Sequence, residues 1–236
     1  MPGTEKLWLC TPADSGLLPQ DVQVWAAWLD ATNETPDGFW STLSSQERER
    51  AARYAAQRER ARFVVARGLL RAILGSALGV EPQSLEFLYS AKGKPSLGGA
   101  FARSGLQFNL AHSGGLAVFA VARNRSVGVD VEQLRPVPDL SDLTKRCLSP
   151  GECAELQSFG AAAKLRGFLQ IWTRKEAWLK ATGEGITELQ GKIDVLGPSG
   201  TEKMSGGPQN GSPTQRLRLY DLAPAPGLLG GLAVFS

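Results

Sequence analysis

The feature of this sequence that most limits its fold is an internal echo between its two halves. Two β-rich runs, Val22–Leu29 and Val127–Glu132, begin 105 positions apart (22 to 127). Two capping boxes, Ser44–Glu47 and Ser149–Glu152, each the start signal of a helix, have the same separation (44 to 149). A strand-then-helix order that recurs at a fixed offset predicts two lobes of similar plan.

The remaining segments predict the same elements in both halves. A helical stretch follows each capping box, to about Leu78 in the first half and, with a break near Gly160, to about Thr182 in the second. Strand-like runs come next, at Leu85–Tyr89, Leu106–His112 and Leu116–Ala122, and then at Ile193–Val195, Leu217–Leu222 and Leu229–Phe235. Residues 197–215, rich in Gly, Pro and Ser, are typical of a mobile surface loop.

We therefore expect an α+β fold of two similar, pseudo-duplicated lobes, residues 1–123 and 124–236. Each lobe would pack a long helix on a small, mainly antiparallel sheet. The cleft between the lobes is the expected place for an active site.

The composition narrows the class of protein. The 236 residues are 42% hydrophobic and 21% charged, as in ordinary globular proteins. The sequence has no run of 18 apolar residues and no basic segment leading into a long apolar one, so we expect neither a membrane span nor a secretory signal. Three cysteines without a CxxC pair argue against a disulfide framework and for a reducing cytoplasm. A single histidine excludes HExxH zinc chemistry, and a net charge of +3 does not indicate a bulk polyanion partner.

The run Val127–Glu132 has the sequence VGVDVE, in which valines alternate with Gly, Asp and Glu at the period of a strand. Asp130 and Glu132 are therefore expected on one face, roughly 7 Å apart. Two carboxylates on one face suit a hard cation such as Mg²⁺, and Gly128 would leave room for a ligand. A solvated acidic face produces the same pattern, and the pattern alone favours that alternative.

Two further segments place basic and acidic residues where a phosphate could bind. In the predicted helix WTRKEAWLK, Glu176 and Lys180 are four positions apart and share a face. They could complete a metal site and hold a phosphate, although an ordinary ion pair is the simpler explanation. Gly93-Lys94-Pro95 would hold a lysine on a stiff turn, ready to meet an anion, although a plain turn explains it equally well.

His112 ends a predicted strand at a Gly-Gly turn. It does not form a nucleophilic pair with Ser113, because adjacent residues of a strand face opposite ways, and the sequence has no GxSxG elbow. His112 is either a phosphate ligand or a turn histidine. Residues 48–71 contain eight arginines and two glutamates. A solvated helix face explains most of the arginines, whereas one or two could bind phosphate; five share one stripe, namely Arg50, Arg53, Arg60, Arg67 and Arg71.

Taken in order, these segments resemble a known family. GKP, FNLAHS, VGVDVE, LTKRCLSPGE and WTRKEAWLKATGEG closely resemble the Sfp-type 4′-phosphopantetheinyl transferases over roughly Ser44 to Gly185. The resemblance implies transfer of the 4′-phosphopantetheine arm of coenzyme A (CoA) to a serine of an apo acyl or peptidyl carrier protein. It also implies a requirement for Mg²⁺ and 3′,5′-ADP as the other product.

The resemblance also implies roles for individual residues. Asp130, Glu132 and Glu176 would bind Mg²⁺, and Glu176, directly or through a water, would be the base for the serine. Lys180 would steady the pyrophosphate, so that Asp130, Glu176 and Lys180 form the expected catalytic set. The expected CoA contacts are Arg50, Arg62, Lys94, Pro95, His112, Lys180 and, as a lesser candidate, Lys175.

The sequence departs from the family at two positions. Ala111 stands where family members usually have serine, and a basic position of the first helix is Glu47. If the Gly-Gly turn twists the strand end, Ala111→Ser would restore a hydroxyl contact and tighten CoA binding by up to about tenfold.

The alternative function is a Mg²⁺-dependent nuclease or a nucleic-acid-binding module built on the arginine helix. The aromatic residues of the sequence (8%) are not interleaved with the basic ones, which argues against this alternative. We expect a monomer that binds CoA and a carrier protein, with neither membrane nor nucleic acid as a partner. By resemblance, the carrier would lie near a group of basic residues, namely Lys145, Arg146, Lys164 and Arg166.

Overall fold

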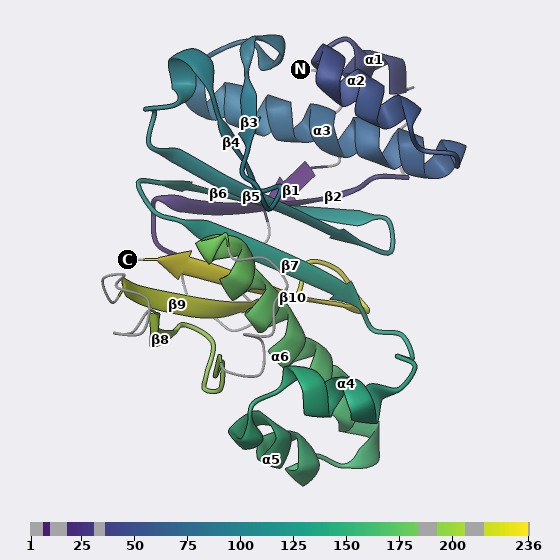
Figure 1. Ribbon diagram of the computed structural model, residues 1–236, viewed down its shortest axis with the longest axis vertical. Helices are drawn as coiled ribbons and strands as arrows, with labels where there is room; N and C mark the ends of the chain where they lie inside the picture. Colours follow the sequence, from purple (N-terminus) through teal and green to yellow (C-terminus); the bar gives the residue numbers. More distant parts are fainter. Residues whose placement is uncertain (1–6, 10–17, 31–35, 184–192, 206–214, 236) are drawn as a thin grey trace.

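Two sheets, packed face to face between two long helices, form the fold (Figure 1). The computed structural model describes residues 7–9, 18–30, 36–183, 193–205 and 215–235. The predicted α+β class with two similar halves is confirmed. Within the described residues, no helix is both long and apolar enough to cross a membrane.

In the first half, the capping box forms as predicted, because Ser44 Oγ accepts from the backbone of Glu47 while the Glu47 carboxylate accepts from the Ser44 backbone. The predicted single helix is in fact two, α2 (Ser45–Ala52) and α3 (Gln57–Leu78). They follow the short α1 (Pro36–Trp40). Neither Gly nor Pro marks the break at Arg53–Ala56, so the sequence did not reveal it.

The first sheet has the order β1-β2-β6-β5 and is antiparallel throughout. A separate ribbon pairs two short strands, and 3₁₀ turns at Pro82–Ser84 and Gly99–Phe101 flank it. The strands of the sheet are β1 (Leu7–Leu9), β2 (Val22–Trp28), β5 (Leu106–Ser113) and β6 (Leu116–Arg123), and those of the ribbon are β3 (Phe87–Tyr89) and β4 (Pro95–Leu97). Helix α3 packs on the outer face of the sheet, where Leu69 and Leu70 of the helix and Phe119 of β6 belong to one apolar core.

The second half repeats this plan, with a sheet of order β7-β10-β9-β8. Its strands are β7 (Val127–Gln133), β8 (Thr201–Ser205), β9 (Gln215–Leu222) and β10 (Leu228–Phe235), and its helices are α4 (Leu140–Cys147), α5 (Pro150–Ser158) and α6 (Ala161–Thr182). The second capping box and the helix break near Gly160 are confirmed. Two expectations are wrong: residues 193–195 form no strand, and β8 lies in the expected loop 197–215.

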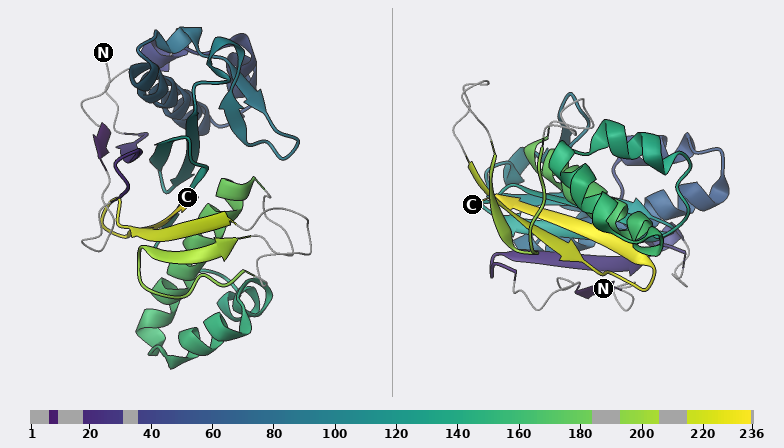
Figure 2. Two further views of the ribbon diagram at one scale, coloured as in Figure 1. Left: turned by 90° about the vertical axis from the view of Figure 1, so that its left-hand side faces the viewer. Right: turned by 90° about the horizontal axis from the view of Figure 1, so that it is seen from below.

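The two sheets pack against each other through an apolar layer that includes Val24, Val118, Val129 and Leu232. Helices α3 and α6 cover the outer faces (Figure 2). A Cβ on Gly128 would lie 2.1 Å from the carbonyl oxygen of Ala177 in α6. Gly128 therefore lets α6 approach β7 closely; the expectation that it makes room for a ligand is wrong, because helix backbone fills that space.

Candidate active site

The acidic strand β7 and the helix α6 meet at an ion pair. Lys180 Nζ lies 2.6 Å from Asp130 Oδ1, and Asp130 is only 6% exposed. Its second oxygen, Oδ2, is buried and has no hydrogen-bond partner among the described residues. Burial raises the pKa of Asp130, and the positive charge of Lys180 opposes that shift. A buried carboxylate with an unsatisfied oxygen is a donor suited to a divalent cation.

The other two predicted carboxylates lie nearby on separate elements. Glu176 is buried one helical turn before Lys180 and helps to line a pocket of about 390 Å³. Glu132 Oε2 accepts a hydrogen bond from Ser113 Oγ at 2.9 Å, which holds its side chain toward β5. Over the described part of the chain, no three Asp, Glu, His or Cys side chains converge closely enough to form a metal-binding group. The donors are hard oxygens that suit Mg²⁺, but Asp130, Glu132 and Glu176 do not converge in this arrangement.

The Gly93–Pro95 turn crosses from the first half to α6. Lys94 Nζ donates to the carbonyl oxygen of Ala181 at 2.9 Å, and burial lowers the pKa of Lys94 to about 8. Gly93 and Pro95 line the pocket beside Glu176 and also an adjoining pocket of about 310 Å³. The two pockets therefore adjoin at this turn, and we refer to them together as the groove, with one compartment for each pocket.

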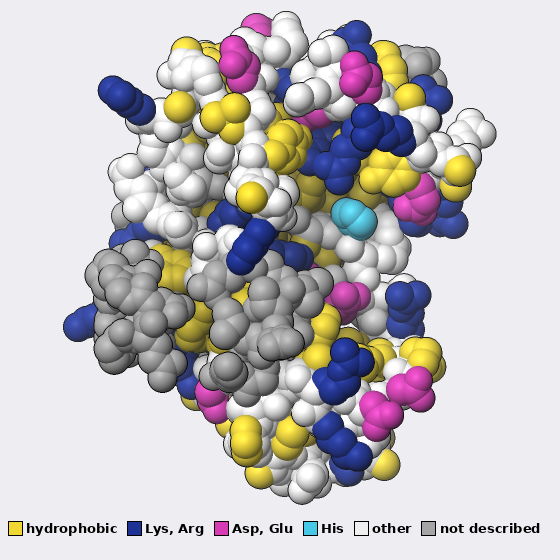
Figure 3. All heavy atoms as spheres, in the orientation of Figure 1, with side chains coloured by type: hydrophobic (Ala, Val, Ile, Leu, Met, Phe, Trp, Pro, Cys, Tyr) yellow, Lys and Arg dark blue, Asp and Glu magenta, His cyan; other side chains and the backbone are white. Residues whose placement is uncertain are grey.

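The adjoining pocket is lined by His112 and by arginines of α2 and α3. Figure 3 shows the single histidine in a hollow between the two halves, with Lys and Arg side chains gathered above it. Burial lowers the pKa of His112, and the positive charges of Lys180 and Arg62 lower it further. Arg50 lines the pocket with its guanidinium 5.5 Å from the ring centre of Phe63.

Arg62 also lines this pocket, but acidic neighbours already hold its guanidinium. It forms ion pairs with Asp30 at 2.7 Å and with Glu59 at 2.9 Å, and Arg58 binds Asp30 as well. Hydrogen bonds from Arg62 and Arg58 hold the pKa of Asp30 well below its usual range. Nothing in the local sequence pattern indicated this pairing, because Asp30 lies 32 positions before Arg62.

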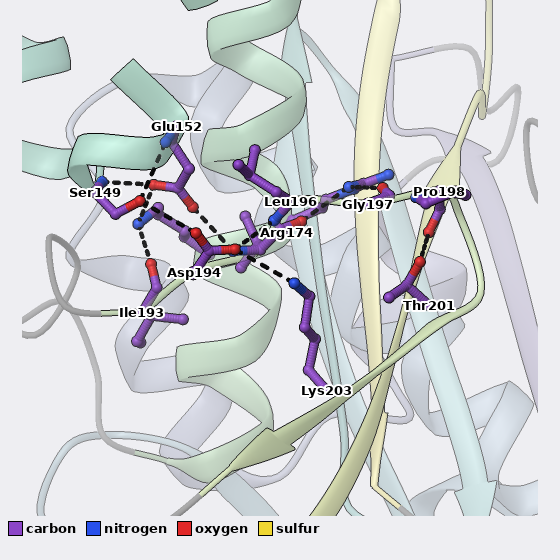
Figure 4. Close-up of polar contacts among 12 residues, drawn as sticks. Ser149, Glu152, Arg174, Ile193, Asp194, Leu196, Gly197, Pro198, Thr201 and Lys203 are labelled. Atoms are coloured by element: carbon purple, nitrogen blue, oxygen red, sulfur yellow. Dashed lines mark hydrogen bonds and ion pairs between the residues drawn. The ribbon is translucent and has the colours of Figure 1, made fainter. Parts of the chain in front are cut away.

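One residue predicted to contact CoA lines neither pocket of the groove. Lys175 is fully buried and pairs with Glu152 of α5 at 2.7 Å, and its Nζ also donates to the carbonyl oxygen of Ile193. The prediction that Lys175 contacts CoA is therefore wrong, because its charge is enclosed in a structural network below α6. Figure 4 shows Glu152, Ser149 and Ile193 in this network.

Ala111 does not face the groove either. It is 5% exposed and packs in the apolar layer between the sheets, whereas His112, the next residue, lies outside that layer and lines the pocket. The strand alternation persists to the end of β5, so the expected twist toward the ligand side is wrong. Glu47 is likewise no ligand, because its carboxylate is buried against Arg71 at 2.8 Å.

Sequence comparisons point to one family. Residues 126–209 match the family model of the 4′-phosphopantetheinyl transferase superfamily, and residues 27–124 match that of the N-terminal part of 4′-phosphopantetheinyl transferase. The 4′-phosphopantetheinyl transferase HetI of Nostoc sp. (strain PCC 7120) is 44% identical over 201 residues, 85% of each chain.

More distant relatives have the same activity in their names. A putative 4′-phosphopantetheinyl transferase of Synechocystis sp. (strain PCC 6803) is 36% identical over 77% of this chain and 66% of its own. A 4′-phosphopantetheinyl transferase of Bacillus subtilis is 28% identical over 64% of this chain and 65% of its own. With a relative this similar over most of both lengths, the chain belongs to the 4′-phosphopantetheinyl transferase superfamily.

Proposed function

We propose that this protein transfers the 4′-phosphopantetheine group of CoA to a serine hydroxyl of an apo acyl or peptidyl carrier protein. The serine oxygen would attack the phosphorus that bears the pantetheine arm. The pyrophosphate P–O bond to the nucleotide would break, and 3′,5′-ADP would leave. The nuclease alternative has no support, because the matched families and the relatives described above are all transferases.

The observation that supports this reaction best is the Lys180–Asp130 pair, with its unsatisfied carboxylate oxygen, beside a groove lined with basic residues. Asp130, Glu132 and Glu176 would hold Mg²⁺ after side-chain rotations that bring their oxygens together. Mg²⁺ would offset the negative charge that builds up on the pyrophosphate. The Ser113 hydroxyl donates to one oxygen of Glu132, so the other carboxylate oxygen of Glu132 remains a potential ligand.

The side chains around this pair would position the two reactants. Glu176, buried next to Lys180, would accept the serine proton directly or through a water. Lys180, which pairs with Asp130 in this arrangement, would donate to oxygens of the pyrophosphate. Lys94 and His112 would face phosphate oxygens, and Pro95 would keep the turn rigid.

The groove suggests how CoA would lie. The compartment with His112 and Arg50 would take the nucleotide end, and the compartment with Glu176 and Lys180 would take the reacting phosphates. Residues 1–123 would then form the CoA-binding lobe and residues 124–236 the acidic, metal-binding lobe. That the protein is a cytoplasmic monomer, with neither membrane nor nucleic acid as a partner, stays a prediction.

The direct test incubates the protein with CoA, Mg²⁺ and an apo carrier protein, and weighs the carrier by mass spectrometry. We expect the carrier to gain one phosphopantetheine group, and the gain to disappear with Asp130→Asn or with a chelator. Circular dichroism would establish that the variant is folded. A carrier of unchanged mass with several apo carriers, or full activity of a folded Asp130→Asn protein, would overturn the proposal.

A further inference from the structure

Arg67 of α3 is a buried cation whose charge is left uncompensated by the described part of the chain. Arg67 is only 7% exposed, and its Nη1 is buried without a hydrogen-bond partner among the described residues. Its guanidinium lies 5.7 Å from the ring centre of Phe63 and 5.8 Å from that of Tyr89. A guanidinium stays charged in proteins, so burying one without an anion is strongly unfavourable.

The next turn of the same helix shows how this chain satisfies a buried arginine. Arg71 is 1% exposed, pairs with Glu47 at 2.8 Å, and donates to the carbonyl oxygens of Pro82 and Leu85. Arg67 has no such set among the described residues. The two arginines are four positions apart on one helix face but differ in their surroundings. Arg71 holds the fold together, whereas Arg67 has no paired anion in the part of the chain that the structure describes.

Arg67 lines the pocket that also contains His112, so an anion can reach it. Its surroundings are aromatic: the ring centres of Phe63 and Tyr54 lie 5.4 Å apart with the rings tilted by 37°, and both residues line the pocket with Arg67. Arg50 and Tyr54 also line a neighbouring pocket of about 530 Å³ that extends to Tyr89. A cation set among aromatic side chains suits a nucleotide, whose phosphate can bind the cation while its planar base packs on the rings.

We propose that Arg67 binds the phosphate monoester on the ribose of a nucleotide, which is the 3′-phosphate of CoA if the proposed function is correct. Two other basic residues that the resemblance implies as CoA contacts, Arg62 and Lys94, already have partners. Arg62 is already held by Asp30 and Glu59. Lys94 donates to the carbonyl oxygen of Ala181 and lines the compartment of Glu176, not that of His112.

The test compares binding of 3′,5′-ADP with binding of 5′-AMP by calorimetry, without any carrier protein. The wild-type protein should prefer 3′,5′-ADP by roughly 10- to 100-fold, the usual strength of a shielded contact to a charged group. Arg67→Met should abolish this preference and leave 5′-AMP binding unchanged. Arg60→Met is the matched control, because Arg60 is exposed on the same helix and lines none of these pockets; it should keep the preference.

Thermal unfolding distinguishes the proposed binding role from a purely structural one, in which Arg67→Met would melt below the wild-type temperature. In thermal unfolding without ligand, Arg67→Met should melt at the wild-type temperature or above it, because an unpaired buried charge has been removed. Arg67→Lys keeps the charge but not the two-pronged donor geometry, and should retain part of the preference. A preference unchanged in Arg67→Met, or lost equally in Arg60→Met, would overturn the proposal.

The binding test also separates this inference from the proposed reaction. If no carrier gains mass but 3′,5′-ADP binds in an Arg67-dependent way, the phosphate site stands and the reaction is wrong. If transfer occurs but Arg67→Met keeps both the wild-type KM for CoA and the wild-type discrimination against dephospho-CoA, the reaction stands and the site is wrong. Inorganic phosphate should compete only weakly; competition as strong as that of 3′,5′-ADP would show that the site does not recognise the nucleoside.

Discussion

Lys175 and Lys180 lie five positions apart on α6, and the structure predicts opposite consequences of losing them. Lys175 and Glu152 have side chains that are both 0% exposed, with Nζ 2.7 Å from Glu152 Oε2. In Lys175→Met, the Glu152 carboxylate stays buried without its cation. Breaking a buried pair in this way costs about 3–5 kcal/mol. For a chain of this length, each kcal/mol lowers the melting temperature by about 2–4 °C, so we expect a drop of about 6–20 °C.

The assay is thermal and urea unfolding followed by tryptophan fluorescence, together with CoA kinetics at a temperature where the variant is folded. The KM for CoA should stay within about twofold of the wild-type value, because Lys175 lines no part of the groove. The double variant Lys175→Met/Glu152→Gln should recover part of the stability, since neither charge is left alone. Lys164→Met, at an exposed position of α6, is the control and should change stability by less than about 0.5 kcal/mol.

Lys180→Met should show the converse pattern. The Lys180 side chain is 30% exposed, and Asp130, whose pKa burial already raises, can take up a proton once the lysine is gone. The loss of Lys180 should therefore lower the melting temperature less than the loss of Lys175. Turnover should fall by about 100-fold or more, because a positive group aimed at developing phosphate charge is lost. The reasoning would be refuted if Lys175→Met kept its stability and raised the KM for CoA, or if both variants lost turnover equally without loss of stability.

Three further outcomes are expected. Because burial lowers the pKa of Lys94 to about 8, the lysine loses its charge as the pH rises through that value; kcat/KM for CoA should fall there, and a fall that persists in Lys94→Met would contradict this. Ala111→Ser should not tighten CoA binding and should lower stability by about 1–3 kcal/mol in urea titrations, because its hydroxyl would enter an apolar layer; tighter binding by calorimetry would count against it. The KM for an acidic carrier should rise with salt, which screens charges beyond about 8–10 Å, and should rise in Lys145→Glu; a KM independent of ionic strength would reject electrostatic docking.

Signals confined to a few neighbouring residues predicted much of the fold. The capping boxes at Ser44 and Ser149 form as predicted, because a serine and a glutamate three positions later satisfy each other's backbone groups locally. Alternation and helical spacing also located β5, β6, β7, β10 and most of α3 and α6. Strand β8 was missed because its pairing with β9 comes from a partner across a Gly- and Pro-rich stretch, not from its own composition.

For the site, the sequence by itself determined which side chains share an element and a face. The spacing in β7 and α6 placed Asp130 on the acidic strand and Glu176 one turn from Lys180, and these assignments need only strand and helix geometry. The family resemblance likewise depended on short motifs alone. Helical spacing, however, gives the direction of a side chain relative to its own helix and says nothing about what other elements bring toward it.

The partners of the charged groups were decided only by the tertiary structure. Lys175 looked like a ligand in the motif, but α5 brings Glu152 to it. Arg67 and Arg71 are alike on the helical stripe, yet Arg71 is paired with Glu47 in the core, whereas Arg67 is buried with no paired anion in the described ranges. The effect of a charge depends on its desolvation and on residues far away in the sequence, and folding alone brings those together.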